Sequence, residues 1–212
     1  MITLNSDAAS TSLSKTTKAI LNEYGIKLNK NLGQNYLIDR NKRDQIIQFG
    51  NLTKDDVVLE IGPGIGTLTI ELAKRVKKVI AIEQDSNICQ ILENRLKKEN
   101  IDNVDLINDD ALNVEFPKFD KIISNLPYQI SSPITFKFLN YDFQLAILMY
   151  QKEFASRMNG KVGSKDYSRL SAMLYFKCDV DLLTGVSAES FIPKPKVDST
   201  VVRLTPKLPE LN

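Results

Sequence analysis

The chain has 212 residues, of which 42% are hydrophobic and 25% charged. This composition is typical of a globular α/β domain, with enough length for a small appendage, and it excludes disorder for most of the chain. The formal net charge of +2 does not by itself indicate a nucleic-acid partner, and the absence of histidine excludes imidazole bases and His-containing zinc sites.

The first part of the chain predicts two helices joined by a loop. Apolar residues at helical spacing predict a short helix over 13–24, which ends at Gly25. The stretch 29–37 is rich in Asn and contains a glycine, so it predicts a loop, and a second helix is expected over 40–49.

From residue 57 onward, apolar runs alternate with helical patterns. Strands are predicted at 57–61, 79–82, 104–107, 121–124 and 145–149, with helices at 68–76, 87–99 and 134–139. This alternation predicts βαβ units and a parallel sheet. The remainder predicts a helix over 168–176 and strands over 181–187 and 199–204.

No apolar run approaches the ~18 residues of a membrane span, and the N-terminus lacks the pattern of a signal peptide. We therefore expect a cytoplasmic protein with no membrane association. The two cysteines, Cys89 and Cys178, lie far apart in the sequence and have no C-x-x-C partner, so we expect them to be small core residues and expect no metal site.

The charges are unevenly distributed along the chain. Residues 1–54 carry 8 Lys and Arg against 4 Asp and Glu, residues 55–120 carry 8 against 14, and residues 121–212 carry 12 against 8. An acidic middle suits a cofactor that is cationic or rich in hydroxyls, whereas basic flanks suit a polyanionic partner. Ordinary solvated surface charge is the alternative interpretation.

A glycine-rich turn follows the predicted strand 57–61. Gly62, Gly64 and Gly66 allow close approach of the backbone to a ligand and expose N–H groups at a helix start. The Gly-x-Gly-x-Gly spacing is one residue shorter than the dinucleotide fingerprint, which argues against a pyrophosphate ligand. Glu83 ends the next strand, where a carboxylate can accept both hydroxyls of a ribose.

Two further strand ends carry polar groups. After the third strand, Asp110 is placed to accept from an adenine amine and the Ala111 N–H to donate to a ring nitrogen, with Asp109 as the competing acid. After the fourth strand, the Asn125 side-chain oxygen and the carbonyl before Pro127 can accept the two hydrogens of an exocyclic amine. Tyr128 offers a flat face for stacking a base. The alternative is that residues 125–128 form a simple turn.

Five ordered motifs resemble the KsgA-type ribosomal RNA adenine dimethyltransferases over residues 28–206, most closely the archaeal and eukaryotic members. These motifs are Leu32-Gly33-Gln34-Asn35-Tyr36-Leu37, Glu60-Ile61-Gly62-Pro63-Gly64, Asn125-Leu126-Pro127-Tyr128, Tyr150-Gln151-Lys152-Glu153-Phe154-Ala155 and Phe191-Ile192-Pro193-Lys194-Pro195-Lys196-Val197-Asp198-Ser199.

The resemblance implies a fold and a set of site residues. The fold is a class I methyltransferase, Rossmann-like α/β, with seven strands of which the last is antiparallel, and the cofactor is S-adenosylmethionine. The implied cofactor contacts are Gln34, Asn35, Leu37, Gly62, Gly64, Glu83, Asp110, Ala111 and Asn125. The implied catalytic set is Asn125, Leu126, Pro127, Tyr128 and Phe191, with Tyr128 and Phe191 on either face of a flipped adenine.

The implied reaction is dimethylation of the exocyclic amines of two adjacent adenines near the 3′ end of small-subunit ribosomal RNA, in ribosome biogenesis, by a monomer. Basic residues expected to hold RNA phosphates are Lys152, Arg157, Lys161, Lys165, Arg169, Lys194 and Lys196. Members of the family usually continue into a small helical domain. We therefore expect an N-terminal extension over 1–27, a catalytic domain over 28–206, and a tail over 207–212 without that helical domain.

Three alternatives share parts of this pattern. Erythromycin-resistance methyltransferases act on large-subunit RNA, but the motifs at 150–155 and 191–199 favour the small-subunit type. A relative of the mitochondrial transcription factors would bind nucleic acid without catalysis, and the intact 125–128 motif argues against this. DNA adenine methyltransferases usually have proline at the second position of that motif, where this chain has Leu126.

Overall fold

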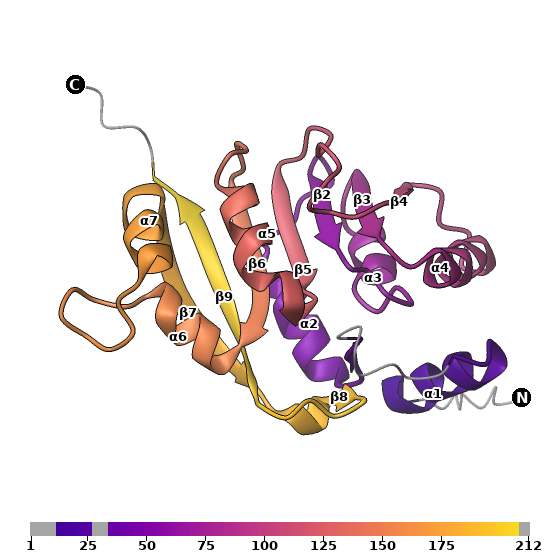
Figure 1. The fold of residues 1–212 in the computed structure, drawn as a ribbon. Helices are drawn as coiled ribbons and strands as arrows, with labels where there is room; N and C mark the ends of the chain where they lie inside the picture. Colours follow the sequence, from indigo (N-terminus) through magenta and orange to yellow (C-terminus); the bar gives the residue numbers. More distant parts are fainter. Residues whose placement is uncertain (1–11, 27–33, 208–212) are drawn as a thin grey trace, which may run out of the picture.

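The computed structural model describes residues 12–26 and 34–207 (Figure 1). Its strands are β1 (Tyr36–Leu37), β2 (Val57–Ile61), β3 (Lys78–Glu83), β4 (Val104–Asn108), β5 (Lys121–Asn125), β6 (Leu145–Gln151), β7 (Cys178–Val186), β8 (Phe191–Ile192) and β9 (Ser199–Pro206). Its α-helices are α1 (Leu13–Glu23), α2 (Arg40–Phe49), α3 (Thr69–Ala73), α4 (Ser86–Lys98), α5 (Ser131–Phe138), α6 (Lys152–Met158) and α7 (Arg169–Lys177). Short 3-10 helices occupy Tyr128–Ile130 and Ala188–Ser190.

A seven-stranded sheet runs through the molecule in the order β4-β3-β2-β5-β6-β9-β7. The pairs among β2 to β6 are parallel, and β9 is antiparallel to both β6 and β7. The expected class I methyltransferase sheet, with its last strand antiparallel, is therefore confirmed. A separate two-stranded sheet joins β1 to β8.

The apolar runs form strands because their side chains are buried on both faces of the sheet. In β2, Leu59 and Ile61 pack in one apolar cluster, which includes residues of α5, α6 and α7. The intervening Val58 packs in a second cluster with residues of α2 and α3. This alternation follows the two-residue period of a strand, and it explains why the runs are continuously apolar.

The main helices begin at side-chain caps. Asp39 Oδ1 accepts from the Lys42 N–H at the start of α2, and Asp85 Oδ1 accepts from the Asn87 and Ile88 N–H groups at the start of α4. Such caps satisfy backbone donors that the helix itself leaves unpaired.

The expected elements are present, most with shifted bounds, and four short elements among the described residues were not predicted. The helix expected over 68–76 is shorter, and the strand expected over 181–187 begins at Cys178. The prediction of a loop over 29–37 is wrong at Tyr36–Leu37, which pair with β8, and β8 and the two 3-10 helices were missed. A two-residue strand owes its stability to a partner far along the chain, so local sequence gives no signal for it.

Parts of the expected domain division lie outside the described residues, namely 1–11, 27–33 and the tail 208–212. Within the residues that are described, α1 represents the N-terminal extension, and the division itself stays a prediction. No helix among the described residues is long and apolar enough to cross a membrane.

Candidate active site

A cavity of about 450 Å³ opens at the carboxyl ends of the parallel strands. It lies where the strand order reverses between β2 and β5, the position at which open α/β sheets bind ligands. Small-ligand cavities measure about 300–1,000 Å³, so a nucleoside-sized molecule fits this one. Its lining includes all nine expected cofactor residues: Gln34, Asn35, Leu37, Gly62, Gly64, Glu83, Asp110, Ala111 and Asn125.

The glycine loop forms one wall of the cavity. Gly62 has a φ of +67°, and a Cβ there would lie 2.9 Å from Pro127 Cγ. Gly64 has a φ of +55°, and a Cβ there would lie 3.2 Å from the Tyr36 ring. Both positions therefore require glycine for backbone conformation and for space. As a result, the loop after β2 packs closely against the loop after β5 and against β1.

Glu83 is held at the end of β3 by backbone donors. Its Oε2 accepts from the Gly64 N–H at 3.2 Å, and its Oε1 accepts from the Asp85 N–H at 3.0 Å. Burial raises the pKa of Glu83 above its usual range, although these two donors oppose the shift. The carboxylate is thus fixed between the glycine loop and α4, with lone pairs left to accept from a ligand.

The N-terminal segment of the cavity is tied to the same region. Gln34 Nε2 donates to Asp85 Oδ2 at 3.4 Å, while Asp85 Oδ1 caps α4. Gln34, which precedes β1, is therefore linked directly to Asp85, which follows β3.

Asp109 and Asp110 both line the cavity, so its geometry leaves the choice between them open. Asp110 Oδ1 accepts from the Leu112 N–H at 2.9 Å, which shapes the turn after β4. Lys137 of α5 supports this turn by donating to the Ala111 carbonyl at 2.9 Å and to the Leu112 carbonyl at 3.2 Å. Lys137 was not among the residues singled out from the sequence.

Asn125 ends β5 with its amide in a defined orientation. Its Nδ2 donates to the Asn35 carbonyl at 3.2 Å, so the Oδ1 end is the one left to accept from a ligand or substrate. The backbone of β5 is also anchored, because Ser124 Oγ donates to the Ile61 carbonyl at 2.6 Å.

The rest of the 125–128 motif also lines the cavity. Leu126 is buried in the core, so only its backbone is available for chemistry. The Tyr128 hydroxyl lies 2.5 Å from Ser199 Oγ, which fixes the ring against β9. Burial raises the pKa of Tyr128, so the phenol stays neutral.

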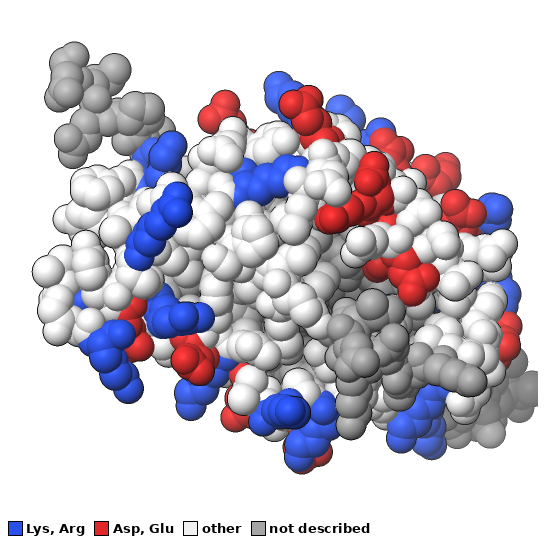
Figure 2. Space-filling view, viewed as in Figure 1, with Lys and Arg blue, Asp and Glu red and all other residues white. Residues whose placement is uncertain are grey.

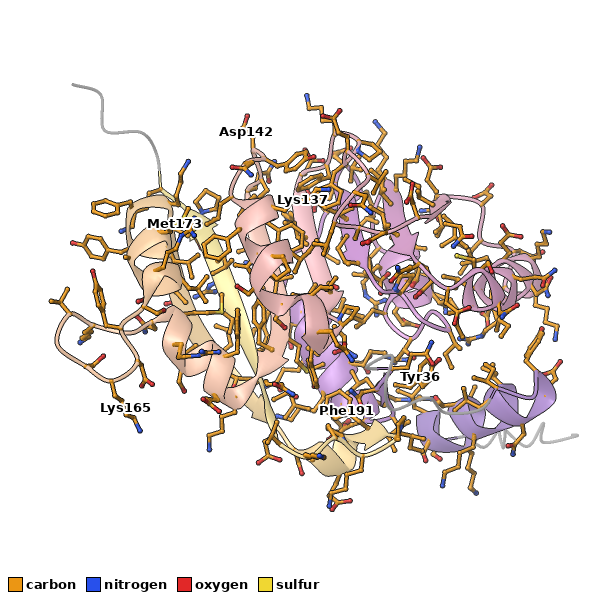
Figure 3. All side chains as sticks on the ribbon, viewed as in Figure 1. Tyr36, Lys137, Asp142, Lys165, Met173 and Phe191 are labelled. Atoms are coloured by element: carbon orange, nitrogen blue, oxygen red, sulfur yellow. The ribbon has the colours of Figure 1, made fainter. Side chains whose placement is uncertain are left out.

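Phe191 is the expected catalytic residue that the structure does not bring to the cavity lining. Its ring is 2% exposed and packs in the apolar cluster that contains Leu37, its strand partner in β1. Figure 3 shows Phe191 near Tyr36 at this end of the molecule. A contact with a flipped base would require the Phe191 side chain to move.

The seven expected RNA-binding residues are all exposed: Lys152, Arg157, Lys161, Lys165, Arg169, Lys194 and Lys196. Five of them lie on α6, on α7 or between these helices, and Lys165 projects from the connecting loop in Figure 3. Lys194 forms an ion pair with Glu189. In Figure 2, basic atoms lie over the α6 and α7 side, whereas acidic atoms gather toward β4.

Sequence reasoning assigned no role to two buried polar residues of the cavity, Glu60 and Tyr36. Glu60 Oε2 and the Tyr36 hydroxyl have no hydrogen-bond partner among the residues that the structure describes. Burial, opposed by the neighbouring Thr69 hydroxyl, raises the pKa of Glu60 to about 8. The sequence does hold a sign that Glu60 is unusual, namely a carboxylate within the otherwise apolar run 57–61.

The lining fits S-adenosylmethionine by its chemistry. It contains the acids Glu60, Glu83, Asp85, Asp109 and Asp110, and none of its described members is Lys or Arg. The cofactor carries a cationic sulfonium, an ammonium and a ribose diol, all of which suit carboxylate and carbonyl acceptors. The fold and this site define a class I S-adenosylmethionine-dependent methyltransferase.

The model of the ribosomal RNA adenine dimethylase family matches residues 25–212. The chain belongs to this family, with S-adenosylmethionine as its methyl donor.

Similar proteins include the probable ribosomal RNA small subunit methyltransferases A of Methanosphaera stadtmanae and Methanothermobacter thermautotrophicus. The first is 54% identical, covering 90% of this chain and 70% of the relative, and the second is 53% identical, covering 90% and 68%.

Two solved structures are also similar. A dimethyladenosine transferase from Plasmodium falciparum is 42% identical with a TM-score of 0.77, covering 81% of this chain and 63% of that one. The 23S rRNA methyltransferase ErmE is 33% identical with a TM-score of 0.73, covering 82% and 70%. This chain thus spans roughly two thirds of the length of these relatives.

Proposed function

We propose that this protein dimethylates the exocyclic amines of two adjacent adenines near the 3′ end of small-subunit ribosomal RNA, acting in the cytoplasm during ribosome biogenesis. Family membership supports ribosomal RNA adenine dimethylation, and the names of the archaeal relatives favour the small subunit. The observation that carries the proposal is the orientation of Asn125, whose Nδ2 is engaged by the Asn35 carbonyl.

The proposed chemistry uses an amide and a backbone carbonyl. An aromatic amine is a poor nucleophile because its lone pair is delocalised into the ring. Asn125 Oδ1 and the Leu126 carbonyl would accept its two hydrogens and draw the nitrogen toward tetrahedral geometry. When bound, S-adenosylmethionine supplies an already activated methyl group, so the protein mainly supplies alignment. The proton can leave to solvent after transfer, and no histidine base is needed.

Tyr128 is the proposed stacking surface for the target base. Its ring lines the cavity beside Asn125, and its hydroxyl is engaged with Ser199, so its orientation is fixed before the base arrives. A fixed aromatic face reduces the cost of holding an unstacked base. Phe191 is proposed as the second face, which requires it to leave the apolar cluster around Leu37.

The exposed basic residues around α6 and α7 are the proposed phosphate contacts. They lie on elements that follow β6 in the chain, while the acidic lining of the cavity comes from β2, β3 and the loops after β3 and β4. This separation would let a polyanionic RNA approach the catalytic end of β5 without placing its phosphates among the carboxylates.

The test is methyl transfer to purified small ribosomal subunits that lack adenine methylation. The protein is incubated with labelled S-adenosylmethionine, and the RNA is digested and analysed by mass spectrometry. We expect dimethyladenosine at two adjacent positions near the 3′ end, formed on the order of 100-fold more slowly with Asn125→Ala. Modification of large-subunit RNA instead would favour 23S rRNA methylation, the reaction for which ErmE is named. Detection of monomethyladenosine alone would contradict the proposal of dimethylation.

A further inference from the structure

The Tyr36 side chain is a buried hydrogen-bonding group that the proposed reaction does not use. It is 6% exposed, and its hydroxyl has no partner among the described residues. An unpaired buried hydroxyl is costly in a folded protein, and Tyr36 lines the cavity, so its hydroxyl is a candidate ligand contact.

The Tyr36 ring is rigidly placed by its surroundings. It belongs to an apolar cluster with Ile65 of the glycine loop and with Ile88 and Ile91 of α4. The strand that carries it pairs with β8, in the register Tyr36 to Ile192. The ring edge also lies against Gly64, where an added Cβ would be only 3.2 Å away. The hydroxyl therefore has little freedom to find another partner.

Glu83 lies close to the Tyr36 ring, because the ring packs against Gly64 and the Gly64 N–H donates to Glu83 Oε2. Burial, followed by the charges of Glu83 and Asp85, raises the pKa of the Tyr36 phenol. The phenol is therefore a neutral O–H donor in the neighbourhood of Glu83. Asp85 is engaged by the Gln34 amide and by the start of α4, and both oxygens of Glu83 accept backbone N–H groups.

A sugar hydroxyl needs both an acceptor and a donor to be fully satisfied. A carboxylate such as Glu83 only accepts, so it can take the proton of a ribose hydroxyl but cannot donate to its oxygen. We propose that the Tyr36 hydroxyl donates to an oxygen of the ribose diol that Glu83 holds, and so discriminates ribose from deoxyribose. This inference rests on the proposed function, with Glu83 in its expected role as the ribose contact.

The test removes the hydroxyl from each side of this bond in turn. Calorimetry measures binding of S-adenosylhomocysteine and of its 2′-deoxy and 3′-deoxy counterparts to the wild type and to Tyr36→Phe. One hydrogen bond corresponds to about a tenfold change in Kd at most. We expect Tyr36→Phe to weaken binding of the ribose ligand about tenfold and to have no effect on one of the deoxy ligands.

Thermal unfolding without ligand provides a second measurement. Because the variant loses only an unpaired hydroxyl, its Tm should equal or exceed that of the wild type. Tyr24→Phe is the matched control, since Tyr24 packs against the same apolar cluster but does not line the cavity. It should leave the affinity for all three ligands unchanged.

The outcomes separate this inference from the proposed function. If Tyr36→Phe binds the ribose ligand as well as the wild type does, or loses affinity equally for all three ligands, the inference is overturned while the cofactor site stands. A lower Tm without ligand also overturns it, because the hydroxyl would then have a structural partner. If the wild type does not bind S-adenosylhomocysteine, the proposed cofactor site fails together with the inference.

Discussion

Asn125 and Glu83 line the same cavity but are expected to contribute to different steps. Glu83 is fixed by the Gly64 and Asp85 N–H groups, as a ribose contact must be, whereas the free end of Asn125 is an amide oxygen. Glu83→Ala should weaken cofactor binding by about 1.5–3 kcal/mol, because it removes a charge-assisted pair. Asn125→Ala should lower turnover on the order of 100-fold and change cofactor affinity only slightly.

Calorimetry and single-turnover methylation measure the two effects separately. If Asn125→Ala lost affinity while its turnover was preserved, Asn125 would be a binding residue. If Glu83→Ala bound the cofactor with unchanged affinity, the ribose assignment would be wrong.

Glu60 makes the stability of the protein depend on pH. Its pKa of about 8 in the folded state lies above the usual value for glutamate, because the carboxyl is buried. Between these two values the folded state binds more protons than the unfolded state, so stability should fall as pH rises from about 4.5 to 8. Glu60→Gln should flatten this part of the profile, measured by urea denaturation at several pH values. A variant with the slope of the wild type would contradict the assignment.

The turn after β4 depends on a lysine from α5. Lys137 donates to the carbonyls of Ala111, Leu112 and Val114, and its Nζ lies 4.4 Å from the centre of the Phe116 ring. Lys137→Met would leave these carbonyls without their donor, and we expect a loss of about 1–3 kcal/mol of stability. Because the turn carries Asp110 and Ala111, S-adenosylhomocysteine should also bind more weakly.

Urea denaturation and calorimetry measure these two losses. Lys118→Met is the matched control, since Lys118 lies on the connection between β4 and β5 and is exposed. Equal stability of the two variants would show that the Lys137 hydrogen bonds contribute little to the turn.

The distribution of charge over the whole molecule predicts how it engages RNA. Each phosphate that a lysine or arginine neutralises releases counterions, so the dependence of binding on salt measures how many phosphates are engaged. The double variant Lys161→Gln/Lys165→Gln should reduce the slope of log K against log salt by about 0.7–0.9 for each phosphate that is no longer neutralised. Binding to a small-subunit RNA fragment over a salt series measures this slope, with Lys97→Gln of α4 as the control. A wild-type slope near zero would refute an electrostatic footprint.

Local patterns in the chain were sufficient to predict the parallel sheet and most of the residues that line the cavity. Apolar runs of strand length alternating with helices predict βαβ units, and the carboxyl ends of such strands always meet at one edge. For that reason Gly62, Glu83, Asp110 and Asn125 could be expected together, although they are far apart in the sequence, and the structure brings all four to one cavity.

Other features depended on contacts between distant segments. The pairing of β1 with β8 places Tyr36 over Gly64 and buries Phe191, and neither two-residue strand carries a signal of its own. The orientation of the Asn125 amide likewise depends on the Asn35 carbonyl. Periodicity and motif spacing report which residues face a core or follow a strand. Burial, hydrogen-bond partners and shifted pKa values are set by neighbours that only the folded chain brings together. These neighbours determine which side chains of the cavity are buried and how they are oriented.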